Sequence, residues 1–140
     1  MLVEATFNRT THEIIGAAIE VHRNLGPGLL ESVYMPCLQY ELATRKLRFV
    51  AERSIPIIYK EMQLDAKYRI DLLVEDVVIV EVKSIDCVME IHKAQVLTYM
   101  RLTGCPAGLL INFDSRPGLS SRPCSIHGAR SASPAFRASP

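Results

Sequence analysis

The feature that most constrains this fold is a group of charged side chains inside the most strand-like stretch of the chain. Residues 67–83 read KYRIDLLVEDVVIVEVK, and Asp71, Glu81 and Lys83 stand there among β-branched and leucine residues. A charge buried in a sheet is costly unless it is paired or bound to a metal ion. A divalent cation removes the repulsion between two carboxylates and uses their oxygens as hard ligands. The segment therefore indicates metal-dependent cleavage of phosphodiesters, with Lys83 as the positive group at the reaction.

Whether Asp71 and Glu81 can bind one ion depends on the register of the hairpin that joins them, because side chains alternate between faces along a strand. A two-residue loop over 75–76 places Asp71 opposite Val80 and turns Glu81 away. A three-residue loop over 75–77 places Asp71 opposite Glu81, and a bulge can give the same result. A metal site requires the second register.

The same charges also have a purely structural interpretation, which the spacing leaves open. Asp71 would form a cross-strand ion pair with Arg69 or Lys83 near an end of the sheet. Lys83, which lies on the same face as Glu81, would then only neutralise that carboxylate.

Polar residues of two expected helices are further candidates. Glu31 stands at the start of the second helix, where the helix dipole favours an acid whether or not it has a catalytic role. Gln95 and Tyr99 lie one turn apart on the third helix, where a glutamine is commonly a solvated boundary residue. His92, one turn earlier, could contact phosphate or be an ordinary surface histidine.

Residue periodicity predicts three helices and four strands. The helices are expected at 10–25, 29–45 and 88–103, and the strands at 47–59, 67–74, 77–83 and 107–113. Thr10 and Glu13 fit a capping box that opens the first helix. Pro36 predicts a kink or a late start of the second helix, and Pro56 an edge or a bulge in the first strand. The order α-α-β-β-β-α-β predicts an α/β (α+β) fold, a mixed sheet flanked by helices.

The last part of the chain differs in composition. Residues 114–140 consist of Ser, Pro, Arg, Ala or Gly at 21 of 27 positions. Such a segment cannot bury enough apolar surface to offset its chain entropy. We therefore expect one domain over residues 1–113, and a disordered tail over residues 114–140 whose removal leaves the stability of the core unchanged or only slightly lower.

Composition narrows the class of protein. The net charge of the 140 residues is +1, but residues 1–113 have a balance of −2, which argues against tight sequence-independent binding of nucleic acid. The four cysteines form no CxxC pair. The first residues resemble no signal peptide, and no apolar run approaches the length of a membrane span. These features favour a cytoplasmic protein with reduced thiols.

Four motifs in order give the chain a family resemblance. Gly28, Glu31 and Tyr34 spell G-x-x-E-x-x-Y, and they are followed by YRID at 68–71, EVK at 81–83 and HKAQVLTYMRLTG at 92–104. Over about residues 10–113 the chain resembles the GxxExxY family of the PD-(D/E)XK nuclease-like superfamily. The resemblance implies a restriction-endonuclease-like core with a site for Mg²⁺ or Mn²⁺.

The resemblance also implies a role for each candidate. The metal ligands would be Asp71, Glu81 and the carbonyl of Val82, and the catalytic set would be Glu31, Asp71, Glu81, Lys83 and Gln95. Lys83 would be the catalytic lysine and Glu31 a carboxylate that supports the metal or its water. Nucleic acid would contact Arg69, His92, Gln95 and Tyr99.

Two functions follow as hypotheses. The first is a metal-dependent nuclease that hydrolyses DNA with a metal-activated water. The alternative is a catalytically inactive nuclease-fold binding module, with a second copy of the chain as a candidate partner. A cleft near Asp71 rimmed by the cationic residues Arg69, His92, Lys93 and Arg101 would favour the nuclease, and a flat apolar face would favour the module.

Overall fold

A five-stranded mixed sheet forms the centre of the protein, whose structure is a computed structural model that describes residues 2–114 and 125–130. The elements in chain order are α1 (Leu2–Leu25), α2 (Glu31–Thr44), β1 (Phe49–Tyr59), β2 (Met62–Val74), β3 (Val78–Lys83), α3 (Glu90–Thr103), β4 (Ala107–Asn112) and β5 (Ser125–Arg130). The strands lie in sequence order across the sheet. Only β3 and β4 pair in parallel, because α3 crosses over between them. The predicted mixed sheet flanked by helices is confirmed.

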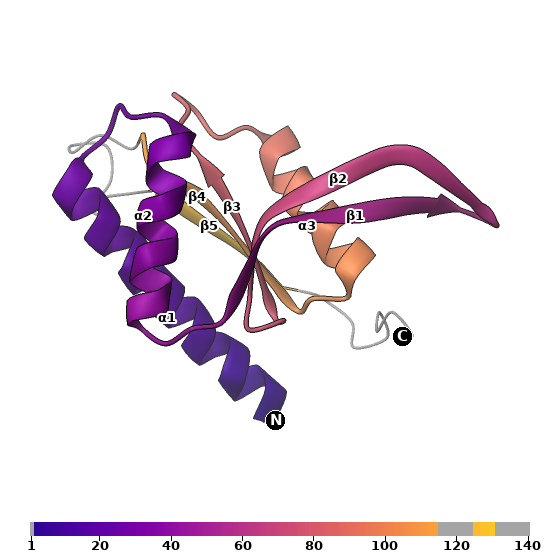
Figure 1. Cartoon of the computed structure of the whole chain (residues 1–140), viewed down its shortest axis with the longest axis horizontal. Helices are drawn as coiled ribbons and strands as arrows, with labels where there is room; N and C mark the ends of the chain where they lie inside the picture. Colours follow the sequence, from indigo (N-terminus) through magenta and orange to yellow (C-terminus); the bar gives the residue numbers. More distant parts are fainter. Residues whose placement is uncertain (1, 115–124, 131–140) are drawn as a thin grey trace.

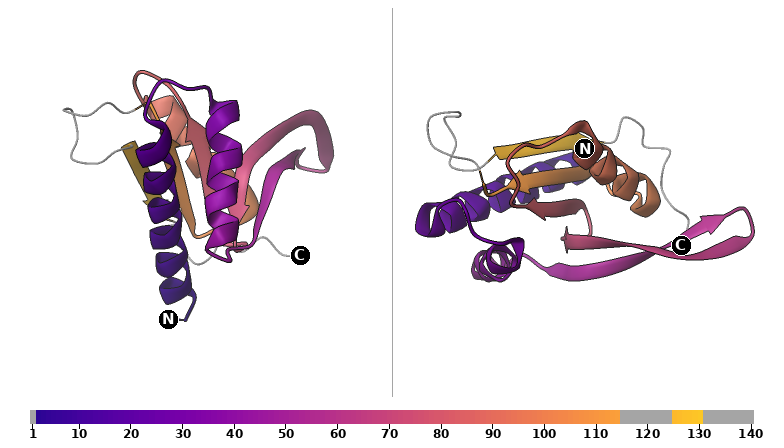
Figure 2. Two further views of the ribbon diagram at one scale, coloured as in Figure 1. Left: turned by 60° about the vertical axis from the view of Figure 1, so that its left-hand side comes forward. Right: turned by 90° about the horizontal axis from the view of Figure 1, so that it is seen from above.

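Helices cover both faces of the sheet, with α1 and α2 on one face and α3 on the other (Figures 1 and 2). The core under α1 and α2 includes Ile14, Tyr34, Leu38, Leu72, Val80 and Phe113. The core under α3 includes Ile70, Leu73, Ile79, Val96 and Leu110. A strand covered on both faces needs apolar residues at every position. This explains the mostly apolar sequences of β3 and β4, and it makes the buried Glu81 within β3 an exception that requires an explanation.

The first helix begins earlier than its sequence pattern predicts. Neither glycine nor proline interrupts residues 2–9, and α1 runs from Leu2 without a break, so that Thr10 lies buried in its interior. The predicted capping box is therefore wrong. Glu13 instead forms an ion pair of 2.9 Å with Arg45, just beyond the end of α2, and this contact ties the two helices together. None of the helices in the described part has the length and apolar character to cross a membrane.

The second helix contains Pro36 but starts before it, at Glu31, so the late start, one of the two alternatives predicted for this proline, is excluded. Its buried stripe is Tyr34, Leu38 and Leu42, spaced one turn apart. Leu30, which precedes the helix and lies within the range expected for it, is exposed.

The first two strands form a hairpin that extends well beyond the rest of the sheet (Figure 1). Its turn is only Lys60 and Glu61, because Tyr59 pairs with Met62. The second strand therefore starts at Met62, five residues before the start at 67 that its sequence pattern predicts. A shift in register directly after Pro56 confirms the irregularity expected there, since proline cannot donate a ladder hydrogen bond.

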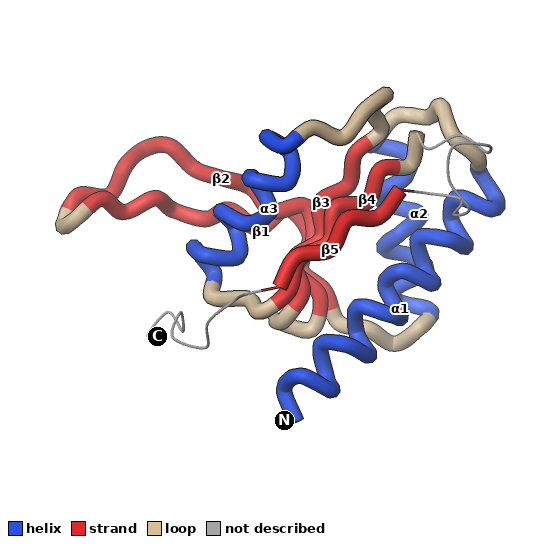
Figure 3. Tube along the Cα trace, turned by 180° about the vertical axis from the view of Figure 1, so that it is seen from behind, coloured by secondary structure: helices blue, strands red, loops and turns tan. Residues whose placement is uncertain are grey.

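The fifth strand contradicts the disorder predicted for residues 114–140. β5 pairs antiparallel with β4, from Ala107 with Arg130 to Asn112 with Ser125, and Figure 3 shows the two strands side by side. Composition measures how much side-chain surface a segment can bury, but β5 is held mainly by the backbone groups that β4 would otherwise leave open at an edge. The prediction is wrong for residues 125–130; residues 115–124 and 131–140 lie outside the described part.

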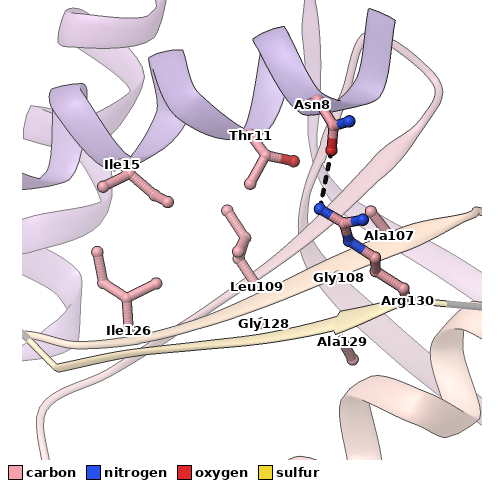
Figure 4. A pocket seen from close by; sticks show the side chains of 10 residues that line it. All are labelled: Asn8, Thr11, Ile15, Ala107, Gly108, Leu109, Ile126, Gly128, Ala129 and Arg130. Atoms are coloured by element: carbon pink, nitrogen blue, oxygen red, sulfur yellow. Dashed lines mark hydrogen bonds between the residues drawn. The ribbon is translucent and has the colours of Figure 1, made fainter. Parts of the chain in front are cut away.

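The contact of β5 with α1 leaves a pocket of about 380 Å³, shown in Figure 4. A hydrogen bond of 3.0 Å from the Arg130 guanidinium to Asn8 Oδ1 bridges one end of it. Ile126 packs against the core under α1 and α2, and Ala129 packs against the core under α3. The strand therefore adds to both cores while leaving unfilled space under α1.

Removing β5 should destabilise the domain. A chain that ends at Asp114 loses the ladder with β4 and the contacts of Ile126 and Ala129. We expect its melting temperature to fall by more than about 5 °C, which is roughly 1–2 kcal/mol for a domain of this size. A chain that ends at Arg130 keeps β5 and is the matched control. Equal melting temperatures for the Asp114 truncation and the full chain would show that β5 contributes nothing.

Two glycines on neighbouring strands should respond oppositely to the same substitution. A Cβ at Gly108 would lie 2.5 Å from Val96 Cγ1, in the packed interface between β4 and α3. Gly108→Ala should therefore cost about 1–3 kcal/mol, the range for overpacked cores. A Cβ at Gly128 meets only Leu109 Cδ2, at 3.8 Å, and points to the pocket under α1. Gly128→Ala should stabilise by about 0.5–1 kcal/mol, because glycine weakens a strand interior. Thermal denaturation of both variants tests this, and a destabilised Gly128→Ala would show that β5 is packed differently.

Candidate active site

The turn between β2 and β3 decides which residues face each other. Val74 pairs with Val78, so the loop is the three-residue one over 75–77. Glu75 and Asp76 both have positive φ, 52° and 56°, and the N–H of Val77 donates to the carbonyl of Val74 at 3.1 Å. This is the register that a metal site requires, because it places Asp71 opposite Glu81.

The carboxylates of Asp71 and Glu81 lie where β2 and β3 separate. Pairing of the two strands ends at Leu72 and Val80. Beyond that point, the N–H of Asp71 donates to Glu81 Oε1 at 3.0 Å, and the N–H of Val82 donates to Asp71 Oδ2 at 2.8 Å. Each side chain thus takes the place of a backbone acceptor on the opposite strand, and the two carboxylates converge between the strands.

The pairing of β2 with its other neighbour, β1, is also interrupted beside Asp71. In β1, Ala51 pairs with Leu72 and Arg53 pairs with Ile70, but Glu52 between them has φ of 55°. A non-glycine residue in that region marks a sharp local change in the strand. On both of its sides, therefore, β2 departs from regular pairing at Asp71, and from there the hairpin leaves the sheet.

Burial makes the carboxylate pair electrostatically unfavourable. Glu81 is only 3% exposed. Its burial and the nearby charge of Asp71 raise its pKa to about 8, and burial likewise raises the pKa of Asp71. Among the described residues, no lysine or arginine lies within ion-pair distance of either carboxylate, and Arg69 instead approaches Glu52 at 3.8 Å. The structural ion pair that the sequence left open is therefore not formed in the described part.

The chemistry of this pair fits a hard divalent cation. Two carboxylates with raised pKa values exchange protons readily for a cation, and their oxygens with the carbonyl of Val82 form the oxygen-only ligand set that Mg²⁺ and Mn²⁺ prefer. No three His, Cys, Asp or Glu side chains of the described residues gather closely enough to ligate one ion. Such a cation would therefore keep several positions for water and substrate, as Mg²⁺ commonly does.

Lys83 ends β3, two residues after Glu81, and is half-buried. Its ammonium makes no hydrogen bond or ion pair with any other residue that the structure describes. Its positive charge nevertheless lowers the pKa values of Asp71 and Glu81, opposing the larger effect of burial. An ammonium near the pair but bound to neither carboxylate can interact with a substrate.

Glu31 reaches the same end of β3 from the start of α2. Its carboxylate accepts a hydrogen bond of 3.3 Å from the N–H of Ser84, and Ser84 Oγ donates to the carbonyl of Leu29 at 2.5 Å. The charge of Glu31 contributes to the raised pKa of Asp71, so the two carboxylates are electrostatic neighbours. Glu31 is thus at the border of the site and bound to the backbone that follows Lys83.

The other two residues of the G-x-x-E-x-x-Y motif hold the loop that precedes Glu31. Gly28 has φ of 95°, which favours glycine. The buried hydroxyl of Tyr34 donates to the carbonyl of Gly26 at 2.6 Å and accepts from the N–H of Leu29 at 3.2 Å. Its ring stacks on Phe113 with centroids 4.5 Å apart. The motif therefore fixes where α2 begins relative to the end of β4.

The predicted pair on α3 also lies at the site. Gln95 Nε2 donates to the hydroxyl of Tyr99 at 2.9 Å. Burial and then the charges of Glu81 and Asp71 raise the pKa of Tyr99, which places this hydroxyl near the carboxylates. His92 has a partly structural role, since its Nδ1 accepts from the N–H of Met89 at 2.9 Å and caps the helix.

The predicted cationic rim is only partly formed. Lys93 lies 3.4 Å from Glu90, and its charge helps lower the pKa of His127 on β5, so it faces away from the carboxylates. Arg101 donates to Thr98 Oγ1 at 3.2 Å near the far end of α3.

The sequence did not identify three residues that support the site or lie at its border. Ser84 binds the start of α2, as described above. Asn112 is buried at the end of β4, where its Oδ1 accepts from the N–H of Ile85 at 3.1 Å and its Nδ2 donates to the carbonyl of Ile85 at 2.9 Å, so it holds the segment after β3. Tyr68 meets the ring of Tyr99 edge to face at 5.7 Å. A polar residue that ends an apolar strand was the available signal for Asn112.

Comparison with known proteins agrees with this geometry. The family model of the PD-(D/E)XK nuclease superfamily matches residues 8–122. Curated proteins and solved structures give no significant match. The match covers most of the chain, including the carboxylate pair, Lys83 and Glu31, and the protein belongs to the PD-(D/E)XK nuclease superfamily.

Proposed function

We propose that the protein is a metal-dependent nuclease of the GxxExxY branch that hydrolyses phosphodiester bonds in DNA. The observation that carries this proposal is the pairing of buried Glu81 with half-buried Asp71 at the point where β2 and β3 separate, with no cationic partner among the described residues. A fold does not retain two such carboxylates for stability, because burying them is unfavourable. Their arrangement is accounted for when a cation binds between them.

The proposed roles follow from where each group lies. Asp71, Glu81 and the carbonyl of Val82 would hold Mg²⁺ or Mn²⁺. When bound, the cation would polarise the scissile phosphate and lower the pKa of the attacking water. Lys83 would place its positive charge against the negative charge that grows on the phosphate in the transition state. Glu31 would accept a hydrogen bond from water at the border of the site.

Four residues would orient the nucleic acid. Gln95 and Tyr99 are bonded to each other beside the carboxylates, and His92 stands one turn before them on α3. Arg69 is exposed on the same hairpin as Asp71, where its guanidinium could move from Glu52 to a phosphate. The chemistry needs no covalent nucleophile from the protein, since positioning and electrostatic stabilisation suffice for phosphoryl transfer.

One observation favours the alternative of an inactive binding module. Lys93 is paired with Glu90, Arg101 is bonded to Thr98, and residues 1–113 have a charge balance of −2, so the surface offers few cations to a DNA backbone. A chain that binds Mn²⁺ but cuts neither plasmid nor single-stranded DNA would support this alternative.

Cation binding should depend on pH through Glu81. The pKa of this carboxyl is raised from 4.5 to about 8, so its contribution to stability is complete below about pH 4.5 and is lost as the pH rises towards 8. A cation replaces the proton and should restore the lost stability at pH 8.5 but add little at pH 5.5. At a concentration of 100 times Kd, we expect Mn²⁺ to add about 2.7 kcal/mol, roughly 8–10 °C in melting temperature.

The control for this experiment is Glu81→Gln, which is neutral at every pH. Its melting temperature should fall less than that of the wild type between pH 5.5 and 8.5, and it should respond weakly to Mn²⁺ at both. Equal stabilisation of wild type and Glu81→Gln by Mn²⁺ would place the cation elsewhere.

Lys83 should be needed for cleavage but not for cation binding. We expect Lys83→Ala to lower the rate of DNA cleavage by about 100-fold or more, the usual loss when one group that stabilises transition-state charge is removed. Its melting temperature should still rise with Mn²⁺, because both carboxylates remain. Lys93→Ala, which removes a lysine paired with Glu90 on α3, is the matched control and should cut like the wild type. A Lys83→Ala protein as active as the wild type would refute the assigned role.

A further inference from the structure

A pocket of about 280 Å³ lies between β2 and α3, beside the carboxylate pair. It is lined by Tyr68 from the hairpin and by Ile91, His92, Gln95, Thr98 and Tyr99 from α3. Its volume is slightly below the range of pockets that take a drug-sized molecule, so it has room for one small planar group rather than for a larger ligand. A nucleobase is such a group.

Tyr68 presents an aromatic surface to this pocket. It is 41% exposed, whereas Tyr99, which it meets edge to face at 5.7 Å, is only 3% exposed. The buried ring of Tyr99 therefore holds the exposed ring of Tyr68 in place from one side. An exposed aromatic ring that is already oriented is suited to stacking, because less side-chain freedom is lost when a ligand binds.

The polar groups in the pocket match the edge of a base better than an apolar ligand. Gln95 uses one amide N–H to bond Tyr99, which leaves its amide oxygen and second N–H for a ligand. Because His92 Nδ1 accepts from the N–H of Met89, the proton of the neutral ring is on Nε2, which can donate. A donor and an acceptor beside an aromatic face are what a single base requires.

The position of the pocket relates it to the reaction. Tyr68 stands three residues before Asp71 on β2, about 10 Å along the strand. Tyr99 contacts Tyr68 on one side, and its hydroxyl lies near the charges of Asp71 and Glu81 on the other. A base seated against Tyr68 would therefore belong to a nucleotide close to the phosphate at the carboxylates.

Charge indicates which form of DNA would use this pocket. A duplex is held mainly by cations on its phosphates, and its bases are stacked inside where a pocket cannot reach them. Here Lys93 is paired with Glu90, the guanidinium of Arg69 lies against Glu52, and Arg101 donates to Thr98 Oγ1 at the border of the pocket, so the described cations near the pocket are few and already have partners. Stacking on aromatic side chains supplies affinity for single strands without sequence preference.

We infer that Tyr68 and α3 form a base-stacking pocket, and that the substrate of this site is single-stranded DNA, or an unpaired end, with one base inserted against Tyr68. This inference rests on the proposed function, of which it names the substrate form. It makes Tyr68 a positioning residue for the nucleotide next to the cleaved phosphate.

The test measures binding and stacking apart from cleavage, using the full chain. Binding of a fluorescein-labelled single-stranded oligonucleotide and of a blunt hairpin duplex is followed by anisotropy in Ca²⁺. In a second single strand, 2-aminopurine replaces one base at successive positions, and its fluorescence falls when it stacks on an aromatic ring. We expect the wild type to prefer the single strand and to quench 2-aminopurine at one position.

Variants of Tyr68 identify the stacking ring. Tyr68→Ala should weaken single-strand binding by about 5- to 150-fold, which corresponds to about 1–3 kcal/mol for one base, and should abolish the quenching. Tyr68→Phe keeps the ring and should behave like the wild type. Tyr59→Ala removes another exposed tyrosine of the same hairpin, outside the pocket, and should also leave binding unchanged.

The outcomes separate this inference from the proposed function. Cleavage of DNA together with wild-type binding by Tyr68→Ala, or with no quenching at any position, would overturn the pocket and leave the nuclease standing. Quenching that Tyr68→Ala abolishes, without cleavage in Mg²⁺ or Mn²⁺, would support the pocket and refute the nuclease. A wild-type chain that binds the duplex as tightly as the single strand would also overturn the inference. If Tyr68→Ala is unfolded, the quenching in wild type and in Tyr68→Phe still decides.

Discussion

The reciprocal contact between Asp71 and Glu81 is the interaction on which the rest of the site depends. Each carboxylate accepts a hydrogen bond from a backbone N–H of the opposite strand, where a regular ladder would have a carbonyl as acceptor. A carboxylate inserted between two strands keeps them apart, so the ladder cannot continue beyond it. The separation of β2 and β3 and the convergence of the two acids thus have a single cause.

The arrangement also explains why the site is buried without being closed. β3 lies in the middle of the sheet, with helices on both faces, and this burial makes Glu81 hard to ionise. Asp71, however, lies where β2 separates from β3 and is only partly buried, and the hydroxyl of Tyr99 lies near both charges. A low local dielectric strengthens the electrostatic interactions of such a pair.

The sequence predicted the core of the fold and the position of most candidate site residues. The apolar runs of β3 and β4 and the helical spacing of apolar residues in α3 are compatible with few other secondary structures. It could not choose the register of the β2–β3 turn. Glu75 and Asp76 both have positive φ. Glycine or asparagine at these positions would have indicated such a turn, whereas two acidic residues do not. The support of Glu31 by Ser84 joins residues more than fifty positions apart, and no local pattern reports such a contact.

The two wrong predictions at the ends of the chain share a different reason. Composition and capping patterns describe what a segment would do alone. In the folded protein, however, α1 begins before the predicted cap, and β5 is held by contacts with distant elements. β5 is stabilised through backbone pairing with β4, which its small and polar side chains do not reveal. For β5 in particular, order depends on the edge that β4 offers to it.

The placement of the site along the chain has a consequence for how the protein folds. Apart from Glu31, every candidate lies between Arg69 and Tyr99, in one hairpin and the helix that follows it. Contacts between residues close in sequence form quickly, since little loop entropy is lost in closing them. The carboxylates can therefore come together as soon as the β2–β3 hairpin does, whereas Glu31 arrives only when α2 docks on the sheet. Assembly of the carboxylate pair is in this sense local, whereas completion of the candidate site depends on the docking of α2 on the sheet.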